Sequence, residues 1–140
     1  MNLISLVFQI FHTILTLFTA LFPHIYTTYD IYYLIYILIV ALQWYIFKGE
    51  CLITYLEKKT LDSSYKLGDK PTYSPFYDII GHSVMALLNS IYFINFSLII
   101  YRNLDNKHLY LIIFFIVSTT IINIIVSYKF KKNNTANKIK

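Results

Sequence analysis

Four long apolar stretches constrain the fold of this chain more than any other feature. They cover residues 3–22, 31–47, 79–101 and 109–128, and no Asp, Glu, Lys or Arg lies inside them. A helix needs about 20 residues to cross the roughly 30 Å hydrocarbon core of a bilayer, and these stretches approach or exceed that length. They show no sustained period-two alternation, which argues against β-strands. We therefore predict an all-α polytopic membrane protein in which four spans pack as a four-helix bundle.

The composition agrees with this class and excludes others. Hydrophobic residues make up 57% of the 140 residues and charged residues 14%, whereas soluble proteins average about a quarter charged residues. The single cysteine, Cys51, excludes an intramolecular disulfide and a cysteine-cluster metal site, and we expect no cofactor and no metal. Ile, Tyr, Asn and Lys are abundant, as in AT-rich genomes that include those of some large DNA viruses. A viral or internal membrane is therefore an expected location.

The basic residues are distributed unevenly among the predicted loops, and this asymmetry predicts the orientation. No Lys or Arg lies between the first two stretches, and only Arg102 and Lys107 lie between the last two. The other ten lie in the central loop, residues 48–75, or after the fourth stretch. Because cytoplasmic loops carry an excess of Lys and Arg, we expect the central loop and both termini to be cytoplasmic.

The segment after the fourth stretch, residues 129–140, is basic and contains no acidic residue. Its composition predicts a disordered tail. Lys129, Lys131 and Lys132 come directly after the span, where each basic residue attracts anionic lipid headgroups by about 1 kcal/mol. No aromatic platform accompanies these lysines, so we expect no nucleic-acid partner.

Each apolar stretch carries polar residues on one side of the helix that it predicts. The sets are Ser5, Gln9, His12, Thr13, Thr16 and Thr19; then Tyr29, Tyr32, Tyr36 and Gln43; then His82, Asn89, Ser90 and Ser97, with Asn95 off this sector; and finally Thr119, Thr120, Asn123 and Ser127. In lipid, polar side chains turn toward neighbouring helices. Every predicted span therefore offers one face for packing.

Two interpretations of these polar faces remain open. In the first, they hydrogen-bond to one another and hold the bundle, and the protein has a structural or partner-binding role, with a homo-oligomer or another membrane protein as partner. In the second, they surround a lipophilic ligand of a small membrane enzyme or carrier, with His12, Gln43, His82 and Asn89 as the ligand-binding residues. Two histidines on different spans could also ligate a haem or a metal, but two such residues alone are a weak signal.

The central loop contains a short amphipathic segment. As a helix, it places Glu50, Thr54 and Glu57 on one side and Leu52 and Leu56 on the other. This pattern predicts an interfacial helix lying on the cytoplasmic surface of the membrane.

The polar residues of this loop also allow two interpretations. Glu50, Cys51, Thr54 and Glu57 are the candidate residues of this interfacial loop, and Glu50, Glu57 and the adjacent Cys51 could form an acid/base or thiol site at the membrane surface. The simpler alternative is that the glutamates are solvated and pair with Lys58 or Lys59.

The same loop resembles a known sequence element. The residues concerned are Trp44, Gly49, Cys51, Leu52, Ile53, Thr54, Leu56 and Glu57, followed by Tyr65 and Gly68. They resemble the W-x-C-P-L-T-x-L-E element of an uncharacterised family of small four-helix membrane proteins from bacteria. Leu52 stands where the family has proline, and the spacing from Trp44 to Cys51 is longer than in the family. The resemblance implies the four-helix fold and no particular activity.

Overall fold

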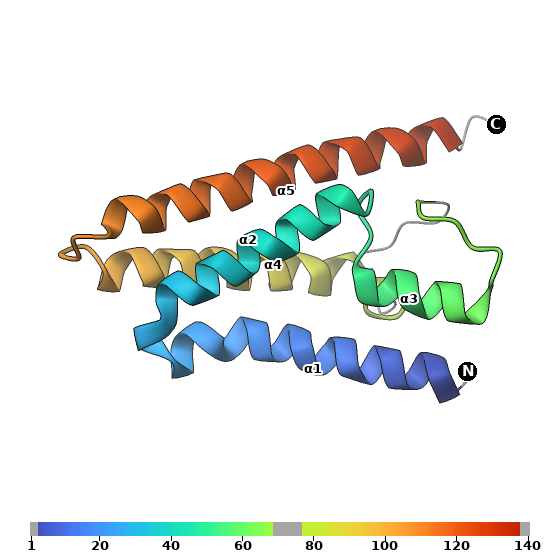
Figure 1. The fold of residues 1–140 in the computed structure, drawn as a ribbon, viewed down its shortest axis with the longest axis horizontal. Coiled ribbons are helices and arrows are strands. Elements are labelled where there is room, and N and C mark those ends of the chain that lie inside the picture. The colour runs from blue at the N-terminus through green and yellow to red at the C-terminus, as the bar shows by residue number, and fades with distance from the viewer. Residues whose placement is uncertain (1–2, 69–76, 138–140) are drawn as a thin grey trace.

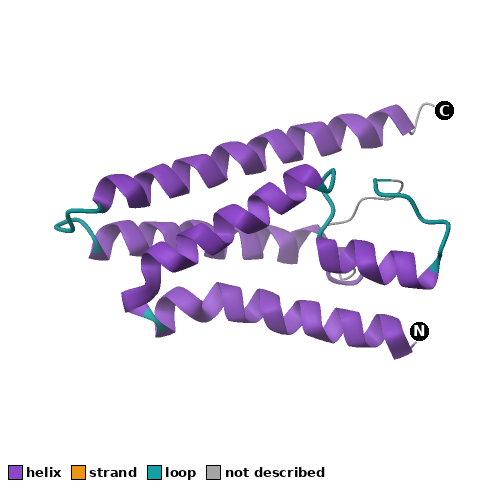
Figure 2. Cartoon of the chain, viewed as in Figure 1, coloured by secondary structure: helices purple, strands orange, loops and turns teal. Residues whose placement is uncertain are grey.

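The computed structural model describes residues 3–68 and 77–137, with side chains described for 3–68 and 90–128, and these parts consist of helices joined by short loops. These parts contain no strand, which confirms the all-α prediction for them (Figure 2). The helices are α1 (Leu3–Ile25), α2 (Asp30–Ile46), α3 (Leu52–Leu61), α4 (Tyr77–Arg102) and α5 (Leu109–Asn137), with a 3-10 turn at Thr27–Tyr29.

The helices are arranged along one long axis (Figure 1). The beginning of α1, the end of α5 and the whole of α3 lie at one end of this axis, which we call the α3 end. The α1–α2 and α4–α5 connections lie at the opposite end, which we call the connection end. Contacts join α1 to α2, α3 and α4, and join α5 to α2 and α4.

Within the part of the chain whose side chains are described, three helical segments are long and apolar enough to cross a membrane. They are Leu3–Ile25, Thr27–Ile46 and Leu109–Tyr128, in agreement with three of the four predicted spans. The remaining predicted span, residues 79–101, lies in α4, where side chains are described only from Ser90 onward. α1 continues past its predicted end at residue 22 and ends at Ile25. The helix tolerates Pro23 because this residue lies in its last turn, where the missing N–H removes only one helical hydrogen bond.

The segment after the fourth span differs from the prediction. α5 continues to Asn137, so residues 129–137 are helical where the composition predicted a disordered tail. The physical reason is local: this segment contains neither Gly nor Pro, and its lysines favour helix once a preceding helix supplies the nucleus. Residues 138–140 lie outside the described part.

The apolar core lies toward the connection end and joins three helices. Tyr33, Leu34 and Ile37 of α2 pack with Phe96 and Ile99 of α4 and with Ile112 of α5. The rings of Phe22 and Tyr33 are stacked with centroids 5.8 Å apart. By contrast, large apolar side chains such as Val7 of α1 and Phe114 of α5 point outward and are each 59% exposed. An apolar exterior of this kind suits lipid better than water.

A tight turn ends α2, after which α3 continues toward the α3 end and packs against α1 (Figure 1). Lys48 and Gly49 both have positive φ, 56° and 86°, and the Gly49 N–H donates to the Trp44 carbonyl at 2.7 Å. This six-residue hydrogen-bonded loop is the Schellman motif that ends many helices.

Candidate functional site

A buried ion pair fastens the connection end of the molecule. The Arg102 guanidinium donates through Nε to Asp30 Oδ2 at 2.6 Å and through Nη2 to Asp30 Oδ1. Its Nη1 donates to the Pro23 carbonyl at 2.6 Å, and Asn103 Nδ2 also donates to the Asp30 carboxylate at 2.6 Å. Sequence reasoning missed this cluster, although a lone Asp at the start of one span and a lone Arg at the end of another were the available signal.

A second polar network lies deeper between α1, α2 and α4. The Asn95 side chain is fully buried and donates to the Ala20 carbonyl at 3.0 Å and to the Tyr33 hydroxyl at 3.1 Å. Its Oδ1 lies 2.9 Å from Nε2 of His24. The sequence placed Asn95 off the packing face of its helix and placed Ser97 on it, and this was wrong: Ser97 is exposed and Asn95 is buried.

The α3 end contains a third network, which connects α1 to the central loop. The Glu57 carboxylate is 4% exposed and accepts hydrogen bonds from the Ser5 hydroxyl and from Gln9 Nε2, the latter at 3.2 Å. Ser5 and Gln9 are one turn apart on α1, where they begin the polar stripe that the sequence predicted. The beginning of this stripe therefore packs against α3, whereas Thr19 at its other end lies near Tyr36 of α2.

The Glu50 carboxylate is completely buried beside the same helix. Glu50 Oε1 accepts from Lys58 Nζ at 2.7 Å and from the Tyr65 hydroxyl at 2.7 Å. The predicted pairing of a loop glutamate with Lys58 is thus present, but the expected solvation of these glutamates is wrong. Lys59 turns the other way and donates to the carbonyls of Ser63 and Tyr65.

The two sides of α3 are reversed relative to a helix that lies on a membrane surface. Its polar side, formed by Thr54 and Glu57, is buried, whereas Leu52, Leu56 and Leu61 are exposed. The reason is that Ser5 and Gln9 of α1 donate hydrogen bonds to the polar side of α3. The Glu57 carboxylate can therefore be buried against α1 and does not need to face water. Cys51, at the start of α3, is also buried.

Three buried polar atoms in this region find no hydrogen-bond partner within the described part of the chain. They are Nδ1 of His12, Oγ1 of Thr54 and Oε2 of Glu50. α3 runs antiparallel to α1 (Figure 1). Because Glu57 lies at the level of Ser5 and Gln9, this direction brings His12 to the level of Thr54 and Glu50. Unpaired buried polar atoms are costly, so they mark a place where a ligand or water would be stabilising.

Two of the four predicted ligand-binding residues can be located. His12 is part of the unpartnered set, and Gln43 of α2 lies beside Cys51, with 4.0 Å between Nε2 and Sγ. The side chains of His82 and Asn89 lie outside the described residues, so the shared cavity stays a prediction. Among the described side chains, no three His, Cys, Asp or Glu residues are grouped as metal ligands.

An apolar groove lies between α1 and α2, and Tyr33 belongs both to its lining and to the Asn95 network. Its volume is about 240 Å³, and its lining residues are Leu15, Phe18, Thr19, Phe22, Tyr32, Tyr33 and Tyr36. The hydroxyls of Thr19 and Tyr36, two of its lining residues, lie 3.4 Å apart.

Comparison with known proteins adds no assignment. No protein-family model matches the chain, and neither a curated protein nor a solved structure is significantly similar to it.

Proposed function

We propose that this chain is a multi-pass integral membrane protein with a structural or partner-binding role. One observation carries the proposal: charged and amide side chains pair with one another between the helices, while the outer sides of α1 and α5 are apolar. In this proposal α1, α2, α4 and α5 form a four-helix bundle with four spans. Its polar contacts act as interhelical links, the role that such groups have in lipid.

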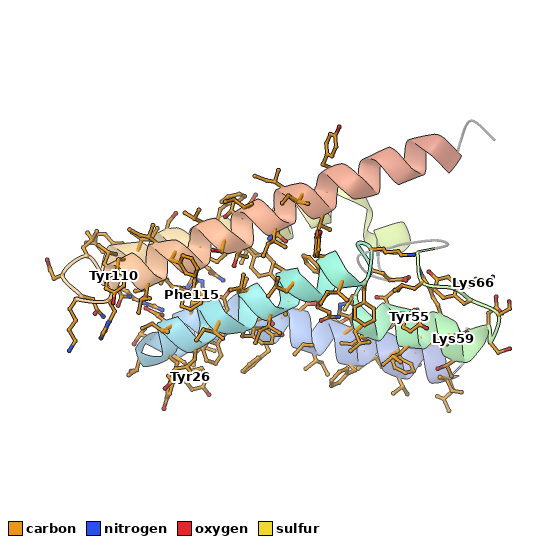
Figure 3. The ribbon with its side chains drawn as sticks, turned by 45° about the horizontal axis from the view of Figure 1, so that its top comes forward. Tyr26, Tyr55, Lys59, Lys66, Tyr110 and Phe115 are labelled. Atoms are coloured by element: carbon orange, nitrogen blue, oxygen red, sulfur yellow. The ribbon has the colours of Figure 1, made fainter. Side chains whose placement is uncertain are left out.

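The proposed orientation places the α3 end in the cytoplasm or on the equivalent side of an internal or viral membrane. Lys59 and Lys66 lie at the α3 end, and Tyr26 and Tyr110 lie at the connection end (Figure 3). α5 extends to Asn137 at the α3 end, so Lys129, Lys131 and Lys132 follow the span on that side. These lysines are the proposed contacts with anionic lipid headgroups.

Thiol accessibility in sealed vesicles tests this topology. In a Cys51→Ala background, single cysteines replace Ser63 in the α3-end loop and Asn106 in the α4–α5 connection, both of which are exposed. A membrane-impermeant maleimide should reach these two positions from opposite sides. Reaction of both from the same side would overturn the proposed topology.

Native mass spectrometry of the protein released from a mild detergent tests the proposed role. A bare chain, a bare oligomer or a complex with a second membrane protein is the expected result. A reproducible added mass of small-molecule size would instead support the alternative function.

The alternative is a small membrane enzyme or carrier that holds a lipophilic ligand in the polar seam between the helices. The specific observation in its favour is the unpartnered set at His12, Thr54 and Glu50. Replacing His12 by Ala should remove the added mass if the ligand binds there, whereas Thr120→Ala should not, because the Thr120 hydroxyl bonds only the Ile116 carbonyl of its own helix.

The resemblance of the Trp44–Gly68 element to small four-helix bacterial membrane proteins remains part of this proposal. It supports the fold and assigns no chemistry to the residues of the loop.

A further inference from the structure

The position of α3 along α1 sets its depth in a membrane. Glu57 is bonded to Ser5 and Gln9, so it lies about 6 Å along α1 from Leu3, the first residue of that helix. Six residues earlier along antiparallel α3, Cys51 lies about 9 Å further in. The start of α3 is therefore about 15 Å along the helix axis from Leu3, where α1 begins. This distance is half of the roughly 30 Å hydrocarbon core.

α2 ends at this same depth. Gln43, in the last turn of α2, lies beside Cys51. In Figure 1, α2 crosses the other helices obliquely and ends partway along the long axis, and α3 continues from there to the end at which α1 begins. The obliquity explains why α2, although long enough to cross a membrane, reaches only partway across this molecule.

From these relations we propose that α2, the break at residues 47–51 and α3 together form one discontinuous membrane span. The break lies near the middle of the bilayer, and Leu52 and Leu56 contact lipid acyl chains. This inference rests on the proposed function, because it requires α1 to span the membrane. In this proposal α3 lies inside the bilayer, whereas the sequence predicted a helix on the membrane surface.

Most polar groups of the α2–α3 segment meet the requirement that lipid imposes. Thr54 Oγ1 and Glu50 Oε2, which have no partner in the described part of the chain, are buried within the protein. Glu57, Lys58 and Lys59 are all bonded to other groups of the protein. The Thr60 hydroxyl, on the outer side, bonds the Leu56 carbonyl of its own helix at 2.7 Å. In the break, Gly49 donates its N–H to the Trp44 carbonyl of α2, and Glu50 donates its N–H to the Phe47 carbonyl within the break itself. Irregular backbone at membrane depth is tolerated when it is buried in protein in this way.

The apolar side of α3, like the outer side of α1, points away from the contact between these two helices. Leu52 and Leu56 are 39% and 43% exposed, and Val7, at the level of Glu57 on α1, is 59% exposed. A surface helix would instead direct its leucines toward the membrane and its carboxylates toward water. Acyl chains are therefore the partner that fits this side of α3.

The depth of Trp44 tests the inference in the unmodified chain, because this is the only tryptophan in the sequence. The protein is reconstituted into phosphatidylcholine vesicles that contain lipids brominated either near the headgroup or near mid-chain. If the break lies near the middle of the bilayer, mid-chain bromines should quench Trp44 more strongly. Stronger quenching by bromines near the headgroup would place the end of α2 at the membrane surface and overturn the inference.

Spin labels provide a second measurement. In the Cys51→Ala background, labels replace Leu56, Ser63 in the following loop and Val117 on the outer side of α5. The label at 56 should resemble that at 117, with high accessibility to oxygen and low accessibility to a water-soluble nickel complex, and the label at 63 should show the reverse. A label at 56 that resembles the one at 63 contradicts the inference alone. A water-accessible label at 117 contradicts the proposed membrane span itself.

Discussion

The Arg102 guanidinium is bonded to both oxygens of the Asp30 carboxylate, which joins the last residue of α4 to the first residue of α2. Only 18% of the Arg102 side chain and 6% of the Asp30 side chain are exposed. The same guanidinium also holds the Pro23 carbonyl near the end of α1. Three helix ends are thus tied to one cation at the connection end.

Asp30→Asn should therefore destabilise the protein strongly. The replacement leaves the Arg102 charge without its carboxylate in a largely buried position, a change that typically costs about 3 kcal/mol or more. The measurement is the unfolding free energy in mixed micelles titrated with a denaturing detergent. Asp105→Asn is the matched control, because Asp105 is exposed in the adjacent connection and its loss should have little effect. Equal stability of the two variants would show that the ion pair contributes nothing.

Asn95→Ala should destabilise the contact between α1, α2 and α4. The substitution removes the bonds to Ala20, Tyr33 and His24, and interhelical hydrogen bonds in membranes average about 0.6 kcal/mol each, so a loss of about 2 kcal/mol is expected. The same detergent titration measures it. Ser97→Ala on the exposed side of α4 is the control, and a comparable loss there would argue against the special position of Asn95.

The difference between Asn95 and Ser97 also shows what the sequence could predict. The apolar stretches predicted the helices, because a helix that crosses a bilayer must be long and apolar, and both properties can be read from the sequence. The side of α4 that faces its neighbours was predicted wrongly. The prediction followed the sector that contains the most polar residues and did not follow the single Asn95 outside it. In lipid, a single amide with three partners decides the orientation more strongly than several serines, whose hydroxyls can bond within their own helix.

The central loop was predicted correctly to contain a helix, but the prediction that its carboxylates are solvated was wrong. The pattern of Glu50, Thr54 and Glu57 opposite Leu52 and Leu56 has two physical solutions, with the carboxylates facing either water or polar partners. The choice depends on Ser5 and Gln9, which are about fifty residues away in the sequence, so local periodicity cannot make it. The stripe on α1 was the available signal, and the two segments had to be considered together.

Glu57→Leu should release α3 from α1. The substitution leaves the Ser5 hydroxyl without its acceptor, while Gln9 keeps its bond to Ser5 Oγ, and an unsatisfied buried donor costs about 1–3 kcal/mol. Cys51, only 8% exposed, reports this release through its rate of alkylation by a small maleimide in detergent micelles. A loss of about 1.4 kcal/mol corresponds to a tenfold faster reaction. Glu57→Gln, which keeps an acceptor oxygen, should increase the rate less. Thr60→Ala on the outer side of α3 should leave it unchanged, and a similar rate in all three variants would refute the docking role of Glu57.

The loop after α3 is predicted to depend on a close approach between Gly68 and Lys48. Gly68 has φ of 89°, and a Cβ added there would lie 3.0 Å from Cδ of Lys48. Gly68→Ala should therefore destabilise the protein, by about 1 kcal/mol for the backbone conformation and further through the crowded lysine stem. Lys48→Gly should remove the crowding, and it places glycine at a position with φ of 56° that glycine prefers. In a double-mutant cycle, Gly68→Ala should cost less in the Lys48→Gly background than in the original chain. Additive effects of the two substitutions would show that the approach of Lys48 to Gly68 does not constrain the loop.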